Sequence, residues 1–132
     1  MTIRVVDSKP RPKTWKGANG IVYHDLSGFG HLSLDLVSIL HQEHIRVAGA
    51  GAHTILLLAQ DVLTVDFEVQ IFASNPQVQA SVGSLAIVGS SFMLRHLTSM
   101  FLSYHRPYYP VERFDCREDA EAWLLQQQQS GS

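Results

Sequence analysis

The spacing of apolar and polar residues divides the first half of the chain into strand-like and helix-like segments. Ile21–His24 is a short run of β-branched and aromatic residues that follows the turn-prone pair Asn19 and Gly20, which predicts a strand or a hairpin arm. Apolar residues then recur at helical spacing over Leu34–Arg46, and Ser33 is a suitable N-cap for that helix.

Two continuous apolar runs, Thr54–Ala59 and Ser84–Val88, predict strands that are covered on both faces. Each run is followed by a helical pattern, so we expect the two strands to be adjacent and parallel. The stretch Val65–Ala73 predicts a short helix between them, and a polar segment connects that helix to the second run.

The last third of the chain repeats the alternation. Ser91–Arg106 has one apolar arc and one polar arc, which predicts a helix that ends at Pro107. Val111–Phe114 alternates as a strand does. A final helix is expected to start at Asp115, with Glu118 three residues later in a pattern similar to a capping box.

Strands followed by helices predict one α/β domain, with a largely parallel or mixed sheet of about four to five strands packed by about four helices. Ala120, Trp123 and Leu124 share a face of the final helix, so Trp123 should pack against the sheet.

The chain has 132 residues, of which 45% are apolar and 17% charged, which is enough for one hydrophobic core. Its longest apolar run, Ile55–Ala59, is far too short to cross a bilayer, and no secretory leader pattern begins the sequence. Cys116 is the one cysteine, so no intrachain disulfide can form. We expect a soluble cytoplasmic protein without membrane insertion.

Charge differs between the two ends of the chain. Residues 1–16 carry a net charge of +4, whereas residues 17–132 carry −6. We therefore divide the chain into a basic N-terminal arm or edge strand (1–16), the α/β domain (17–126) and a disordered, glutamine-rich tail (127–132). The arm has no aromatic residue other than Trp15 interleaved with its basic side chains, so we expect it to be solvated or docked on its own domain and not to bind nucleic acid.

Several segments resemble a known family. They are Leu85–Ser90, Phe101-Leu102, the connection Arg106–Pro110, and Arg113-Phe114 followed by Glu118–Leu124. Together they resemble the small bacterial STAS-like, or SpoIIAA-like, proteins over about residues 19–125. The resemblance implies a mixed sheet with helices packed on it. It also points to relatives such as the anti-sigma-factor antagonists, which bind protein partners and are switched by phosphorylation of a serine or threonine at a helix start.

In those relatives the phosphorylated motif is an aspartate followed by two hydroxyl residues and a glycine. This chain has Asp61–Asp66 in that region, and Thr64 is the residue that could take the place of the phosphorylated one. A phosphate on Thr64 would meet the free amides of a helix N-terminus but would be opposed by Asp61, Asp66 and Glu68. The alternative interpretation is that Thr64 is simply an N-cap.

Seven histidines raise the possibility of a metal site. His41 and His44 lie three residues apart on one predicted helix, and His24 or His31 could supply a third ligand. No zinc-protease motif and no second cysteine accompany them, so we expect partly exposed histidines without a metal. Nothing in the sequence places a base near Cys116. We therefore predict no catalytic residue, no cofactor, and a protein that is not an enzyme.

Two functions remain. The first is a non-enzymatic protein-interaction or regulatory module of unknown pathway, acting on a protein partner or on itself as a homodimer. Its candidate interface contains Leu102 on the outer face of its helix, followed by Arg106, Tyr108 and Tyr109, and Leu102→Glu should disrupt such a dimer.

The alternative function is the binding of a small apolar ligand or a lipid. Four apolar side chains of the helix Ser91–Arg106 could line a cavity for it, or could belong to an ordinary core: Phe92, Met93, Met100 and Phe101. A closed core with an exposed apolar patch would favour the first function, and a pocket would favour the second.

Overall fold

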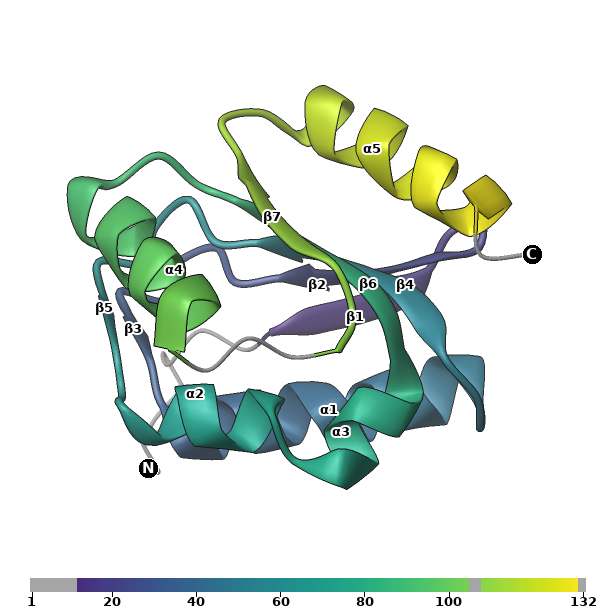
Figure 1. Ribbon diagram of the computed structural model, residues 1–132, viewed down its shortest axis with the longest axis horizontal. Helices are drawn as coiled ribbons and strands as arrows, with labels where there is room; N and C mark the ends of the chain where they lie inside the picture. Colours follow the sequence, from purple (N-terminus) through teal and green to yellow (C-terminus); the bar gives the residue numbers. More distant parts are fainter. Residues whose placement is uncertain (1–11, 105–107, 131–132) are drawn as a thin grey trace, which may run out of the picture.

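A five-stranded mixed sheet organises the molecule, with helices on both of its faces (Figure 1). The computed structural model describes residues 12–104 and 108–130, including their side chains except those of Met93, Leu97, Phe101, Leu102, Tyr104 and Ser130. The strand order is β1-β2-β4-β6-β7. β1 is antiparallel to β2, and the other neighbouring strands are parallel. A second sheet pairs β3 with β5 in parallel.

The bounds of the elements are as follows. The strands are β1 (Lys13–Lys16), β2 (Ile21–Asp25), β3 (His31–Leu32), β4 (His53–Leu58), β5 (Thr64–Val65), β6 (Val82–Val88) and β7 (Val111–Phe114). The helices are α1 (Leu34–Ala48), α2 (Glu68–Ala73), α3 (Pro76–Ser81), α4 (Phe92–Tyr104) and α5 (Arg117–Ser130). None of these described helices is long and apolar enough to span a bilayer.

The two apolar runs form the adjacent parallel strands β4 and β6, as predicted. Side chains of a strand alternate between the two faces of a sheet, so each run supplies two cores. Leu56 and Ala86 pack toward α5, whereas Ile55 and Leu57 belong to the two cores on the opposite face. The expected α/β architecture is therefore confirmed.

Of the described helices, α5, in yellow in Figure 1, covers one face of the sheet. Ala120 and Leu124 are fully buried there against β2, β4 and β6. Trp123 packs against the same core, with its ring 5.6 Å from that of Phe114 on β7. The predicted contact of Trp123 with the sheet is thus present.

The opposite face carries four helices. α1 contacts β1 and β2, α3 contacts β6, and α2 contacts both α1 and α3. Helix α4 contacts β5 and β7, at the end of the molecule where the two-stranded sheet lies (Figure 1). In α1, Ser33 is the N-cap as predicted, because its Oγ accepts from Leu36 N at 3.1 Å. The helix ends at Gly49, whose φ of 78° is a left-handed conformation that favours glycine.

Two segments in the middle of the chain differ from prediction. The helix expected over Val65–Ala73 begins only at Glu68, because Thr64 and Val65 pair with β3 instead. The polar segment that follows is not a loop: it contains α3, which Asn75 caps by accepting from Gln77 N, with Pro76 in its first turn.

The C-terminal region also requires two corrections. Asp115 does not begin the last helix, which starts at Arg117. The carboxylate of Asp115 instead accepts a hydrogen bond from Arg113 Nη1 at 2.7 Å. The tail predicted over 127–132 is helical as far as Ser130, since α5 continues through the glutamines. One of these glutamines, Gln128, donates to Asn19 O at 3.3 Å.

Candidate functional site

A cavity of about 160 Å³ lies between the sheet and the helices α1, α2, α3 and α4. Most of its wall is aliphatic or aromatic: Leu57 and Ile87 come from the sheet, Val69 and Phe72 from α2, and Leu94 from α4. Such a wall offers an apolar environment to a compact molecule.

Three histidines bring polar atoms to this apolar wall. His24 reaches it from β2, and His41 and His44 reach it from α1. His24 Nδ1 lies 2.7 Å from Thr14 Oγ1, and His44 Nε2 lies 3.1 Å from His53 Nδ1. Each of these two buried rings is therefore fixed by a hydrogen bond to a neighbouring element.

The protonation of His41 follows from its hydrogen bond. Ser81 Oγ donates its proton to Val78 O at 2.8 Å, so it can only accept from His41 Nε2, at 3.2 Å. His41 therefore carries its proton on Nε2. The ring also meets those of Phe72 and His44 edge to face, at centroid distances of 5.9 and 6.2 Å.

Burial keeps these imidazoles neutral. Desolvation, with the nearby His44 as a further cause, lowers the pKa of His24 from its usual 6.5 to about 4. Desolvation also lowers the pKa of His44 to about 4, with a contribution from His53. Burial lowers the pKa of His41 as well. At neutral pH the cavity wall therefore carries no charge from these rings.

The expectation of partly exposed histidines is wrong for His24 and His44, which are 4% and 1% exposed. The pattern of β2 held the signal for His24, because Val22 and His24 alternate onto one face of a buried strand. His31 is far from this group and binds Thr64 and Asp66 instead. Within residues 12–104 and 108–130, no three histidine, cysteine, aspartate or glutamate side chains are placed to hold a metal ion.

Thr64 does not lie at a helix N-terminus. It is in β5, where its Oγ1 lies 2.7 Å from His31 Nδ1, and α2 begins four residues later at Glu68. Asp66, on the other side of His31, lies 2.8 Å from Nε2 and also accepts from Leu34 N. The expected position of Thr64 at a helix start, and its role as an N-cap, are therefore wrong, because its side chain links β5 to β3. Phosphorylation of Thr64 stays a prediction.

The four residues of the candidate interface have different positions. Tyr108 is 95% exposed, whereas Tyr109 is buried and its hydroxyl donates to Ala73 O at 2.9 Å. Burial raises the pKa of Tyr109, whose ring lines the cavity. Tyr109 is therefore not part of a surface patch. The side chain of Leu102 and all of Arg106 lie outside the described residues.

The apolar side chains expected to line a cavity are also placed differently. Phe92 is 82% exposed and Met100 37% exposed, and neither contributes to the cavity wall. From α4, Leu94 and Thr98 do so instead. The side chains of Met93 and Phe101 lie outside the described residues.

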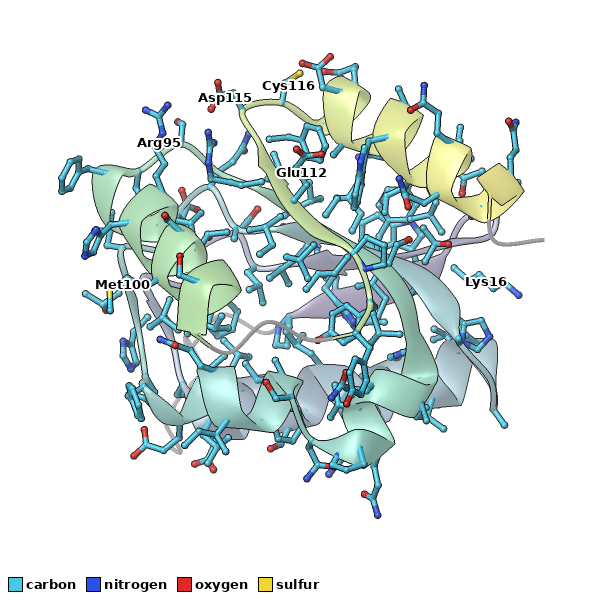
Figure 2. All side chains as sticks on the ribbon, viewed as in Figure 1. Lys16, Arg95, Met100, Glu112, Asp115 and Cys116 are labelled. Carbon is cyan, nitrogen blue, oxygen red and sulfur yellow. The ribbon has the colours of Figure 1, made fainter. Side chains whose placement is uncertain are left out.

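Five large apolar side chains are exposed on α2, on α4 and on the residues directly before β5 and α2. They are Leu63 (59% exposed), Phe67 (60%), Ile71 (55%), Phe92 (82%) and Met100 (37%), and we call them the α2–α4 surface. Figure 2 shows Met100 projecting outward from α4 at the left of the view, and α4 contacts β5 on this side. Single exposed apolar residues are common, but this many on neighbouring elements are typical of an interaction site.

Comparison with known proteins supports the fold and leaves the function open. The model of a family described as a domain of unknown function, DUF7793, matches residues 15–128. The chain is also similar to the crystal structure of an uncharacterized protein of the DUF3478 family, with a SpoIIAA-like fold, from Shewanella loihica PV-4. The TM-score is 0.58 at 10% identity, and the match covers 86% of this chain and 92% of that one.

This likeness confirms the predicted SpoIIAA-like fold, and at such low identity it concerns the fold alone. No protein with a curated description matches the chain.

Proposed function

Because the chain belongs to the DUF7793 family, whose function is unknown, we propose a function from its own surface: it is a non-enzymatic interaction module that forms a homodimer through the α2–α4 surface. The observation that carries this proposal is the exposure of Leu63 before β5, Ile71 on α2 and Phe92 on α4, each of which is more than half exposed. Apolar and aromatic side chains at the centre of an interface supply most of its binding energy.

The charges on the α2–α4 surface favour a second copy of this chain as its binding partner. A two-fold interface places one surface against itself, so the surface must be complementary to itself. The α2–α4 surface carries both signs of charge, with Glu68 beside Ile71 on α2 and Arg95 beside Phe92 on α4. Figure 2 shows Arg95 extending outward from α4 into solvent. Pairing about a two-fold axis would bring Arg95 of one copy toward Glu68 of the other.

Light scattering during size-exclusion chromatography tests this proposal. We expect the unmodified protein to be a dimer and Phe92→Glu to be a monomer, because two carboxylates would then be desolvated in one interface. Leu125→Glu is the matched control, since Leu125 is a partly exposed leucine on α5, across the sheet. It should remain dimeric. A monomeric unmodified protein would refute self-association, and a dimer that tolerates Phe92→Glu would refute this surface.

A second candidate function is supported by the cavity. We propose that it binds a small apolar molecule, because its wall is apolar and its volume of about 160 Å³ is close to that of cavities that bind benzene. This volume holds a compact molecule. Saturable binding of benzene, followed by the shifts of methyl NMR signals from Leu57 and Ile87, would support the proposal. Unchanged signals at saturating benzene would contradict it.

A further inference from the structure

His24 lines the cavity and has one ring nitrogen without a hydrogen-bond partner among the described residues. Its side chain is 4% exposed, lines the cavity, and is fixed at Nδ1 by Thr14 Oγ1. Among the described residues Thr14 is the one hydrogen-bond partner of this ring, so Nε2 has none. The side chain as a whole is thus buried, yet one of its two ring nitrogens has no hydrogen bond to the described residues.

The position of Nε2 follows from the rest of the structure. Every side-chain nitrogen or oxygen of the described residues that is closed off from water has a hydrogen-bond partner. Nε2 of His24 has no such partner, so it must border a space that a small molecule can reach. The space that this buried ring lines is the cavity. The nitrogen is therefore available to an occupant of the cavity.

The other two imidazoles in the wall do not offer the same atom. Nε2 of His41 donates to Ser81 Oγ, and Nε2 of His44 is paired with His53 Nδ1. In both rings the nitrogen farthest from the backbone is already bonded. His24 is thus the histidine whose outer nitrogen remains for a ligand.

The chemistry of the ligand follows from that of the ring and the wall. His24 is neutral at pH 7, so it offers either a donor or an acceptor at Nε2, depending on which way the bond to Thr14 runs. A hydroxyl group satisfies both cases because it can donate and accept. A charged ligand would lose its hydration without meeting an opposite charge among these lining residues.

We propose that the cavity binds a compact, largely apolar molecule of about the size of benzene that carries one hydroxyl group, with that hydroxyl hydrogen-bonded to Nε2 of His24. The proposal rests on the second candidate function, namely that the cavity takes a ligand at all. It adds the polar group of the ligand and the atom that recognises it.

Phenol and benzene are the matched probes, because they differ by the hydroxyl alone. Isothermal titration at pH 7 should show phenol binding about fivefold more tightly than benzene, the gain typical of one neutral hydrogen bond. In long-range ¹H–¹⁵N spectra of the imidazoles, phenol should shift Nε2 of His24, and benzene should leave it nearly unchanged.

Two variants with matched controls locate the site. His24→Phe keeps a ring in the wall but removes Nε2, so phenol and benzene should then bind with about equal affinity. His96→Phe, on the outside of α4, should retain the preference for phenol. Ala73→Leu adds bulk to the cavity wall and should weaken both probes about tenfold or more, whereas Ala122→Leu on the exposed face of α5 should weaken neither.

The outcomes separate the two proposals. Benzene binding that equals or exceeds phenol binding would overturn the hydroxyl site and leave the ligand-binding function standing. Failure of both probes to bind would overturn both. If His24→Phe does not fold, the ¹⁵N shifts of the unmodified protein decide, because phenol that binds without shifting Nε2 contradicts the proposed contact.

Discussion

At the scale of single residues, the unusual feature is a set of imidazoles buried beside an apolar cavity. A histidine in such a place is stable in the neutral form because charging it would require a desolvated cation. His24 and His44 have pKa values of about 4 for this reason, well below their usual 6.5. In the unfolded chain both would regain ordinary values, so the folded and unfolded states bind different numbers of protons.

The first prediction concerns acid stability. Between pH 4 and pH 6.5 the unfolded chain binds more protons than the folded protein at His24 and His44. The stabilisation is therefore fully present above pH 6.5 and is lost as the pH falls toward 4. We expect the free energy of unfolding to fall by about 1.4 kcal/mol per pH unit for each of the two histidines.

Urea unfolding at several pH values between about 7 and about 5 measures this slope, in a range above the titration of most carboxylates. His24→Phe should make the slope clearly smaller, because it removes one of the buried neutral histidines while His44 remains. His96→Phe, at an exposed position on α4, should leave the slope as it is. A free energy of unfolding that does not change over this range would contradict the burial of neutral His24 and His44.

At the scale of elements, the junction between β6 and α4 depends on a glycine. A Cβ atom on Gly89 would overlap Leu94 Cδ2 and lie 2.9 Å from the carbonyl oxygen of Ala59. The strand end, the loop after β4 and the first turn of α4 therefore approach one another at a distance that only hydrogen at this position allows. Leu94 is also part of the cavity wall, so this close approach helps to set the shape of the cavity.

We predict that Gly89→Ala destabilises the protein by about 1–3 kcal/mol, the usual effect of forcing extra volume into a packed site. The matched control is Gly83→Ala on the same strand, where a Cβ would lie 3.6 Å from His53 O, an ordinary contact. It should change the free energy of unfolding by less than about 0.5 kcal/mol. The free energies of unfolding of the two variants are compared by thermal or urea unfolding. Equal losses of stability would mean that the structure around Gly89 can accommodate a Cβ atom without strain.

The elements also show what local pattern can and cannot predict. The continuous runs of β4 and β6 predicted their burial, their adjacency and their direction, because such runs are typical of parallel strands covered on both faces. The pattern failed at Thr64 and Val65, which were placed at the start of a helix but pair with β3, more than thirty residues earlier. Asn75 and Pro76 did carry a helix start signal for α3, which was missed because the segment after them is polar.

At the scale of the whole molecule, stability is expected to be uneven. β4 and β6 lie in the centre of the sheet with apolar contacts on both faces, whereas β1 is at an edge and α2 is a helix of 6 residues. Amide protons exchange most slowly where burial and hydrogen bonding of the backbone are most complete. The third prediction is therefore an order of protection, with β4 and β6 slowest to exchange.

Native-state hydrogen exchange followed by NMR measures this order. The amides of Ile55, Leu56 and Ala86 should exchange at least about tenfold more slowly than those of α2. Leu124, on α5, is fully buried against the same core as Leu56 and should be protected almost as well. Equal protection of α2 and β4 would show that the protein opens as one unit.

The candidate site was less predictable from the sequence than the fold. Its wall comes from segments distributed between His24 and Tyr109, and no short motif joins them. Tyr109 follows an exposed tyrosine in the sequence and was assigned to the surface, yet its hydroxyl reaches Ala73 O inside the molecule. Such a site depends on which strands become neighbours and on how far each side chain reaches across the space between them, and periodicity reports neither.

The two outer strands of the main sheet affect how the protein behaves at high concentration. An unpaired strand edge can recruit another chain and lead to aggregation. Here both edges are short, at 4 residues each, and both carry charge: Lys13 and Lys16 on β1, Glu112 and Arg113 on β7. Burying these charges would oppose the extension of the sheet from one molecule to the next. Resistance to fibre formation is thus built into the ends of the sheet, and stable assembly is left to surfaces formed by side chains.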